Sequence, residues 1–290
     1  MKYDVLNKIS TRFIIILCVI ILSVLSLVKY KSDSQKWIDA DVTVKMPFEI
    51  SILDIGKADF ILIEIDGSYM VIDSGTYDDG EKIYEYLNFK EVKDIEYFIL
   101  THNDKDHIGG SPFIIENFNI KNLIQANYKV NTNQYNKYLD CLEVKKIKPI
   151  LLKNNMEFEI NDAKIKLYPT KKEKYEKSND YSIIISIEYG EYKYLFAADA
   201  EEERMKEFVE DNSEKYTFLK MPHHGIYSNY TEEFLSSVEP RYAIVTCSKF
   251  RYPNKKTIDL LEKYNIKTFY TSSGDIIIKS DGEKIYFNQN

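Results

Sequence analysis

The sequence predicts a mixed α/β (α+β) domain of about 240 residues, long enough to bury one sizeable core. Two observations lead to this prediction. After residue 47, apolar runs of strand length alternate with longer, helix-like stretches. Several of the strand-like runs lead directly into polar residues, as strands do where they deliver side chains to a sheet edge. We therefore expect residues 47–290 to form a single domain.

An apolar segment precedes this domain. Residues 13–28 are uncharged and follow several basic residues. The run is slightly short for a membrane span of about 20 residues and slightly long for the core of a signal peptide. No small-x-small cleavage pattern follows, so we expect an uncleaved anchor over residues 1–30 and a linker over 31–46. This predicts a single-pass protein of the cell membrane with its domain outside the cytoplasm. A protein secreted after signal cleavage is the alternative.

The first half of the domain begins with three strands. Residues 48–75 alternate between strand and turn, with Asp66 and Gly67 as a hairpin signal between apolar runs. Asp73 ends the third strand, where an Asp is as typical of a turn as of a site. The elements expected next are a helix over 80–87, a buried strand over 95–100 and the start of a helix over 111–118.

Four potential metal ligands follow the buried strand, in the stretch THNDKDHIGG over residues 101–110. They are His102, Asp104, Asp106 and His107. Imidazole with carboxylate suits zinc, manganese or iron. A polar loop with Asp as turn former is the plainer interpretation. It is disfavoured because the chain has only four histidines, and the other two are adjacent and also follow a strand-like run.

The second half supplies further polar residues at strand ends. A strand over 192–197 places Asp199 at its end, and a strand over 216–221 delivers His223 and His224. Between them, residues 201–210 read as a helix whose acidic first turn suits the helix dipole. The remaining strands are expected over 164–167, 181–188, 242–247, 268–271, 275–279 and 284–287, with a helix over 257–264.

Lysine is concentrated between residues 121 and 155, with Tyr128, Tyr135 and Tyr138 interleaved. Such a stretch can hold a phosphate backbone and stack bases. A solvated surface is the favoured interpretation, because lysine and tyrosine are abundant throughout the chain. The net charge of −7 gives no general attraction for nucleic acid.

The ligand stretch resembles the HxxxDH signature of the metallo-β-lactamase superfamily. Its Asp at the third position, followed by Ile-Gly-Gly, resembles the ComEC/Rec2-like competence-protein branch. Four other blocks resemble that branch in the same order: ILDIGKAD at 52–59, MVIDSG at 70–75, LFAAD at 195–199 and LKMPHHG at 219–225.

This resemblance implies a four-layer αβ/βα sandwich and a divalent metal site holding one or two ions, zinc or manganese. The implied ligands are His102, Asp104, Asp106, His107, Asp199 and His224. Asp106 would also orient the attacking water, and Asp73 would support the site from behind. We assign His223 as the proton donor to the leaving group, although either member of the His pair suits either role.

The chain departs from the family pattern in three places. No His lies between His107 and Asp199 to act as the middle ligand, although Asp180 or Ser182 is near the equivalent position. The usual Ser after His-His-Gly is Ile226, with Ser228 and Asn229 close by. Residues 252–256 read YPNKK where relatives often carry a final His-Pro.

The function that the resemblance implies is hydrolysis, with metal-bound hydroxide attacking a phosphodiester. Single-stranded DNA or another phosphodiester is the expected substrate, so we predict a nuclease or phosphodiesterase. Two alternatives remain open. One is a hydrolase of a small ester, lactone or thioester. The other is a non-catalytic surface protein with a degenerate metal site.

Overall fold

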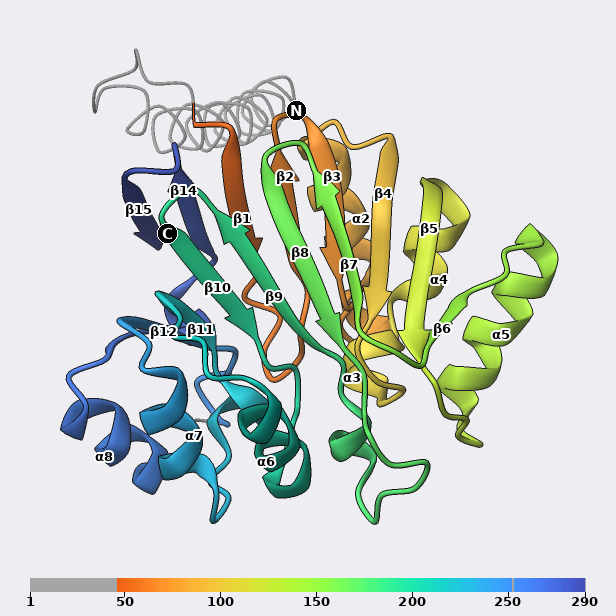
Figure 1. The fold of residues 1–290 in the computed structure, drawn as a ribbon. Coiled ribbons are helices and arrows are strands. Elements are labelled where there is room, and N and C mark those ends of the chain that lie inside the picture. Colours follow the sequence, from red (N-terminus) through yellow and green to blue (C-terminus); the bar gives the residue numbers. More distant parts are fainter. Residues whose placement is uncertain (1–45, 252, 290) are drawn as a thin grey trace, which may run out of the picture. The chain divides into compact units, whose positions relative to one another are not determined.

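The computed structural model describes residues 46–251 and 253–289, which form two β-sheets packed face to face (Figure 1). The first sheet has the order β15-β14-β1-β2-β3-β4-β5-β6, and the second has the order β13-β12-β11-β10-β9-β8-β7. The strands of the first sheet are β1 (Phe48–Ile52), β2 (Ile61–Ile65), β3 (Ser68–Ile72), β4 (Asp94–Leu100), β5 (Asn119–Ala126), β6 (Ile150–Leu152), β14 (Ile276–Ser280) and β15 (Ile285–Gln289). Those of the second are β7 (Met156–Ile160), β8 (Ala163–Tyr168), β9 (Ile184–Tyr189), β10 (Tyr192–Phe196), β11 (Phe218–Lys220), β12 (Tyr242–Val245) and β13 (Lys267–Tyr270).

Helices cover the outer face of each sheet (Figure 1). Apolar side chains of α2 (Gly80–Phe89), α4 (Ser111–Asn117) and α5 (Asn133–Lys145) pack on the first sheet. Those of α6 (Glu202–Asp211), α7 (Thr231–Val238) and α8 (Lys255–Lys263) pack on the second. A third apolar cluster lies between the sheets. The result is the four-layer mixed α/β sandwich that the resemblance implies.

Short helical turns occupy the loops. They are α3 (Lys105–Ile108), η1 (Tyr77–Asp79), η2 (Ser178–Tyr181), η3 (Pro222–Gly225) and η4 (Thr271–Ser273). Strands β3 to β6 are parallel, as are β10 to β13. Parallel strands have their carboxyl ends at one edge, which is where an α/β sheet usually carries its site. The loops after β4, β10 and β11 meet at such an edge.

The structure corrects the expectations for residues 119–181. The elements β5, α5, β6 and β7 were not predicted, and β9 begins at Ile184 because residues 178–181 form η2. Within the lysine-rich stretch, Tyr135 and Tyr138 face the core, with 2% and 0% exposure. Neither ring is therefore free to stack a base, and the solvated-surface interpretation fits better.

The segment expected to be a membrane anchor lies outside the described residues. Across 46–251 and 253–289, no helix is both long and apolar enough to span a bilayer.

Candidate metal centre

The ligand loop leaves β4 and folds tightly against residues 74–77. A Cβ at Gly110 would lie 2.1 Å from the backbone oxygen of Ser74, and one at Gly109 would lie 2.5 Å from the backbone nitrogen of Tyr77. Any side chain at these two positions would push the loop away from its support. The pair Gly109-Gly110 therefore keeps α3, with Asp106 and His107, at the sheet edge.

His107 is held from behind by Asp73. Its Nδ1 lies 2.7 Å from Asp73 Oδ2, and Asp73 also accepts hydrogen bonds from Thr101 N at 2.8 Å and Thr101 Oγ1 at 2.7 Å. A carboxylate on Nδ1 favours the tautomer whose free Nε2 can bind a metal. That Nε2 lies 3.3 Å from Asp199 Oδ1.

His224 enters the site through a strained turn. His223, His224 and Gly225 have φ angles of 46°, 54° and 76°, a conformation that non-glycine residues rarely adopt and that often marks a functional site. The His224 Nδ1 lies 2.8 Å from Thr246 Oγ1. Its Nε2 faces Asp199 Oδ2 at 3.3 Å and Asp106 Oδ2 at 3.8 Å.

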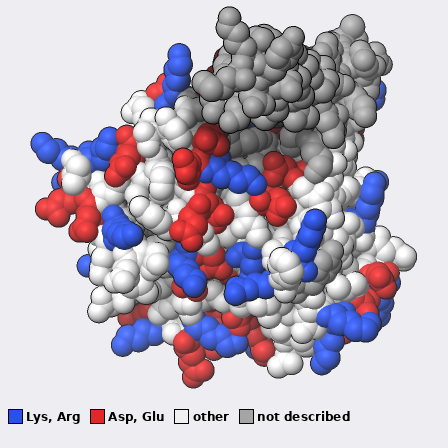
Figure 2. Space-filling model, turned by 180° about the vertical axis from the view of Figure 1, so that it is seen from behind, with Lys and Arg blue, Asp and Glu red and all other residues white. Residues whose placement is uncertain are grey.

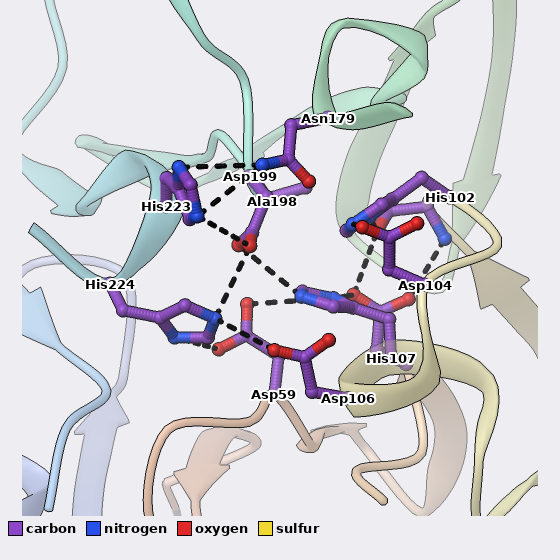
Figure 3. Close-up of polar contacts among 12 residues, drawn as sticks. Asp59, His102, Asp104, Asp106, His107, Asn179, Ala198, Asp199, His223 and His224 are labelled. Carbon is purple, nitrogen blue, oxygen red and sulfur yellow. Dashed lines mark hydrogen bonds and ion pairs between the residues drawn. The ribbon is translucent and has the colours of Figure 1, made fainter. Parts of the chain in front are cut away.

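Four side chains therefore converge at one point (Figure 3). Asp106, His107, Asp199 and His224 offer ligand atoms that all lie within 4.8 Å of one another. Asp106 is the most exposed of the four, whereas the other three are buried.

His102 and Asp104 lie beside this cluster. The His102 and His107 rings have centroids 4.0 Å apart, and His102 Nε2 is 3.9 Å from Asp104 Oδ2. Ser178 Oγ donates a hydrogen bond of 2.8 Å to the same Asp104 oxygen. The structure thus brings together all six residues expected as ligands, with four in one tight group and two at its side.

The chemistry of these groups fits a divalent metal. Among the described residues, Nε2 of His102, His107 and His224 and Oδ1 of Asp199 are buried without a hydrogen-bond partner. Leaving such atoms unpaired costs about 1–3 kcal/mol each unless a ligand satisfies them. Four orphaned atoms at one edge are therefore suited to hold a cation.

The pKa values of His102 and Asp199 point the same way. Burial and the neighbouring His107 hold the pKa of His102 well below its ordinary value, so its ring is neutral and keeps a lone pair for a metal. Burial alone would raise the pKa of Asp199, but the His224 and His107 rings outweigh it and the pKa lies well below its ordinary value. The carboxylate is therefore ionised.

Two buried residues at the site were not predicted from the sequence. Lys220 is fully buried, pairs with Asp59, and donates a 3.0 Å hydrogen bond to the backbone oxygen of Ala198. Asp59 in turn accepts a 2.7 Å hydrogen bond from Thr246 Oγ1, the group that contacts His224. A chain of contacts thus runs from Lys220 through Asp59 and Thr246 to His224.

Both residues lay in recognised blocks. Asp59 closes ILDIGKAD, in which Lys57-Ala58 replaces the Gln-Gly of the block that it resembles. Lys220 is the second residue of LKMPHHG, in which the two histidines are the residues of metal-ligand type.

His223 stands to the open side of the cluster. Its Nε2 is 3.8 Å from Asp199 Oδ2, its Nδ1 is 3.4 Å from Glu201 Oε1, and Asn179 Nδ2 approaches the ring at 3.3 Å (Figure 3). Burial lowers its pKa, and Asp199 only partly opposes this, so the neutral ring is favoured. Glu201 is the N-cap residue of α6, makes no side-chain capping hydrogen bond, and borders His223.

The residues considered as substitutes for the missing middle ligand and for the missing Ser after His-His-Gly have other partners. Asp180 accepts from the backbone of Glu201 and Arg204 at the start of α6. Ser182 Oγ accepts from Asp199 N at 3.3 Å. Ser228 bonds to Thr231 at the start of α7, and Asn229 bonds to Glu202.

Comparison with known proteins gives the family. The model of the metallo-beta-lactamase superfamily matches residues 54–248, which contain the whole cluster. The chain belongs to the metallo-beta-lactamase superfamily. It is accordingly a metal-dependent hydrolase by family, with a candidate site for a divalent metal.

Two curated relatives place this superfamily member in the ComEC/Rec2-like branch. It is 24% identical over 251 residues to ComE operon protein 3 of Bacillus subtilis, covering 79% of this chain and 32% of that protein. It is 23% identical over 254 residues to Recombination protein 2 of Haemophilus influenzae, covering 84% and 30%. The chain thus spans about a third of the length of the curated relatives it matches.

Solved structures agree on the fold of this superfamily member. The metallo-beta-lactamase fold protein YhfI of Bacillus subtilis matches with a TM-score of 0.52 and 12% identity, over 84% of this chain and all of that one. CmlA, a diiron beta-hydroxylase from Streptomyces venezuelae, matches with a TM-score of 0.52 and 10% identity, over 82% and 55%. At these identities the likeness concerns the fold alone.

Proposed function

We propose that this domain hydrolyses phosphodiester bonds, with single-stranded nucleic acid as the substrate class. The observation that carries the proposal is the carboxylate-rich cluster, in which Asp106 and Asp199 join His107 and His224 within 4.8 Å. Such a set suits manganese as well as zinc. The likeness to a protein named Recombination protein 2 is in keeping with a nucleic-acid substrate.

A divalent metal held by these four residues would lower the pKa of a bound water and so supply the nucleophile. Asp106, the most exposed of them, would orient that water through its second carboxylate oxygen. The His102 and Asp104 pair would hold a second, weaker ion. Asp73 and Thr246 would keep the two ligand imidazoles in the required tautomer by their contacts with Nδ1.

His223 is proposed to meet the leaving oxygen, because it stands to the open side of the cluster. A neutral imidazole keeps one ring N–H, which can donate a hydrogen bond and then the proton. Glu201 and Asn179 border the ring and would fix its orientation.

A small-ester hydrolase is the second candidate. Its support is the charge of the molecule. Figure 2 shows Lys and Arg intermixed with Asp and Glu on the face opposite to that in Figure 1, and the whole chain has a net charge of −7. Neither feature attracts a long polyanion in general.

We also propose that the protein is attached to a membrane through residues 1–30.

The test uses the full chain, purified without chelator. Metal content is measured by mass spectrometry, and cleavage of labelled single-stranded DNA is followed with added zinc or manganese. The matched control is Asp106→Asn, which keeps the size of the side chain but removes its charge. Bound metal with cleavage that the variant lacks would support the proposal. Bound metal without cleavage would favour a small ester as the substrate. A protein that binds no metal and stays inactive would refute the proposed hydrolase activity.

A further inference from the structure

We infer that the turn formed by residues 248–251, with Phe250 at its tip, binds the nucleic-acid strand beside the metal centre by stacking a base on the Phe250 ring. We name it the Phe250 turn. The inference rests on the proposed function and specifies which surface holds the substrate. It concerns residues outside the ligand set.

The Phe250 turn is built onto the His224 side of the site. It begins two residues after Thr246, whose hydroxyl contacts His224 Nδ1 at 2.8 Å. Beyond it, Asn254 N donates a 3.1 Å hydrogen bond to the backbone oxygen of Gly225, the residue that follows His224. Both ends of the turn are therefore anchored to the segment that carries a metal ligand.

The turn itself is closed by its own contacts. Ser248 and Arg251 form an isolated antiparallel bridge, and Arg251 N donates to Ser248 O and Oγ, both at 3.1 Å. Lys249 and Phe250 occupy the tip. A short closed turn of this kind presents its tip residues with little freedom, as a binding loop on a rigid scaffold does.

Phe250 is 99% exposed, more than any other large apolar residue of the described chain. Transferring a side chain of this size from water to a covering surface is worth about 1.5–3 kcal/mol. A base provides such a surface, because every base has a flat face that stacks on an aromatic ring. The exposure of the Phe250 ring beside a proposed hydrolytic site thus favours a role in stacking a base of the substrate.

The charge around this ring fits a phosphate backbone. Lys249 and Arg251 flank it and are exposed. Among the ion pairs of the described residues, none involves Lys249, Arg251 or Lys57. Lys57 lies on the same side of the site, since it follows Gly56, where an added Cβ would lie 3.8 Å from Ser248 Cβ. These cations are free to meet phosphates.

The lysine-rich stretch over residues 121–155 does not offer the same combination. Its tyrosines at 135 and 138 are buried. Tyr128 is already stacked on Tyr181, with ring centroids 4.0 Å apart. An exposed aromatic ring with unpaired cations on both sides is found at the Phe250 turn.

The experiment measures binding without cleavage. The full chain carrying Asp106→Asn is titrated against fluorescein-labelled oligo(dT), and fluorescence anisotropy gives Kd. Adding Phe250→Ala is expected to raise Kd about 5- to 150-fold, the usual value of one stacked base. Phe250→Trp should retain the affinity. Adding Lys249→Ala or Arg251→Ala should make the dependence of log Kd on log salt shallower, because fewer counterions are released.

Phe89→Ala is the matched control. Phe89 is 56% exposed at the far end of α2, whereas α2 begins beside the ligand loop, so this change should leave Kd unaltered. A Kd for Phe250→Ala within twofold of its parent, or an equal loss for Phe89→Ala, would overturn the inference. Phe250-dependent binding by a protein whose unmutated form cleaves no diester would uphold the inference and refute the proposed hydrolysis.

Discussion

The two adjacent histidines have different surroundings, and this difference favours different roles for them. His224 is 2% exposed; its Nδ1 contacts Thr246, and its Nε2, which has no hydrogen-bond partner, faces Asp199. His223 has a side chain that is 15% exposed and borders Glu201. One position is suited to holding a metal and the other to meeting a substrate.

Replacing each histidine by Asn should therefore give opposite patterns. His224→Asn is expected to lower the metal content. His223→Asn is expected to keep the metal and to lower kcat about 100- to 10,000-fold, the usual contribution of a positioned acid. Mass spectrometry of the purified variants and steady-state kinetics with a chromogenic diester separate the two effects. Metal lost from His223→Asn and retained by His224→Asn would reverse the assignment.

Glu49 on β1 provides a pH dependence far from the metal. Burial by itself raises its pKa, but the ammonium groups of Lys90 and Lys279 outweigh burial, and the pKa lies below its ordinary value of 4.5. The Glu49 carboxylate therefore binds a proton more readily in the unfolded chain than in the folded protein. The stabilisation is therefore present above about pH 4.5 and is lost as the pH falls through the lower, folded pKa.

Glu49→Gln measures this contribution. At pH 7 the free energy of unfolding of the variant should be lower by about 1.5–3 kcal/mol, the usual value of hydrogen bonds to a charged group. The difference from the unmodified protein should shrink on acidification below pH 4.5. Urea unfolding at pH 7 and near pH 3.5 provides the comparison. An equal difference at both pH values would contradict the assignment.

The residues that sequence could locate are those at the ends of recognisable strands. His102, Asp199 and His224 each follow an apolar run, so their position could be inferred before their contacts were known. Asp59 depends on a contact with Thr246, which is 187 residues away in the chain. A contact over such a separation cannot be predicted from a local sequence pattern. The fully buried Lys220 is equally hard to predict, because lysine is normally a surface residue.

At the scale of elements, the turn η3 and the strand β12 act as a pair. η3 carries His224 in a left-handed conformation, and the residue after β12, Thr246, fixes the orientation of that ring. Asp59 and Lys220 support Thr246 from behind. Losing the hydroxyl should therefore weaken metal binding without removing a ligand.

Thr246→Val tests this support, because it replaces the hydroxyl by a methyl group of similar size. Metal affinity, measured by competition with a chromophoric chelator, should fall about 10- to 100-fold, as is usual for groups that orient a ligand. Thr246→Ser keeps the hydroxyl and should stay within a few-fold of the unmodified protein. Equal affinity for Val and Ser would show that packing alone holds His224.

Element prediction failed where polar residues obscured an apolar pattern. In α5, Tyr135, Tyr138 and Leu142 are buried at helical spacing. The lysines between them make the segment resemble a solvated surface and obscure this apolar pattern. Tyr181 was expected to begin a strand, but residues 178–181 form η2, from which Ser178 reaches Asp104. The four-layer arrangement could be anticipated only through family resemblance, since strand order in a sheet depends on contacts between distant segments.

At the scale of the whole described domain, the site joins the two sheets. Asp106 and His107 follow a strand of the first sheet, whereas Asp199 and His224 follow strands of the second. A cation bound between them would tie the two halves together at this edge. Metal binding should therefore contribute to global stability as well as to activity.

Metal removal tests this coupling. A protein stripped with EDTA and dialysed should have a Tm lower by about 5–10 °C than the same protein with zinc at a hundredfold excess over Kd. Differential scanning calorimetry at a fixed protein concentration measures the shift. The shift should largely disappear in His224→Asn. A Tm that does not respond to zinc would show that the cation site is not formed.

The pairing of β1 with β14 has a consequence for biosynthesis. Phe48 lies opposite Ser280, so a strand near the start of the domain takes its partner from near the end. Until residues 276–280 have left the ribosome, β1 exposes an unpaired edge whose residues are all buried in the finished fold. During synthesis this strand edge stays unpaired and prone to aggregation. We therefore expect folding of the nascent chain to depend on chaperones, or on rapid synthesis of the remaining residues, more than the folding of a domain whose neighbouring strands are also neighbours in sequence.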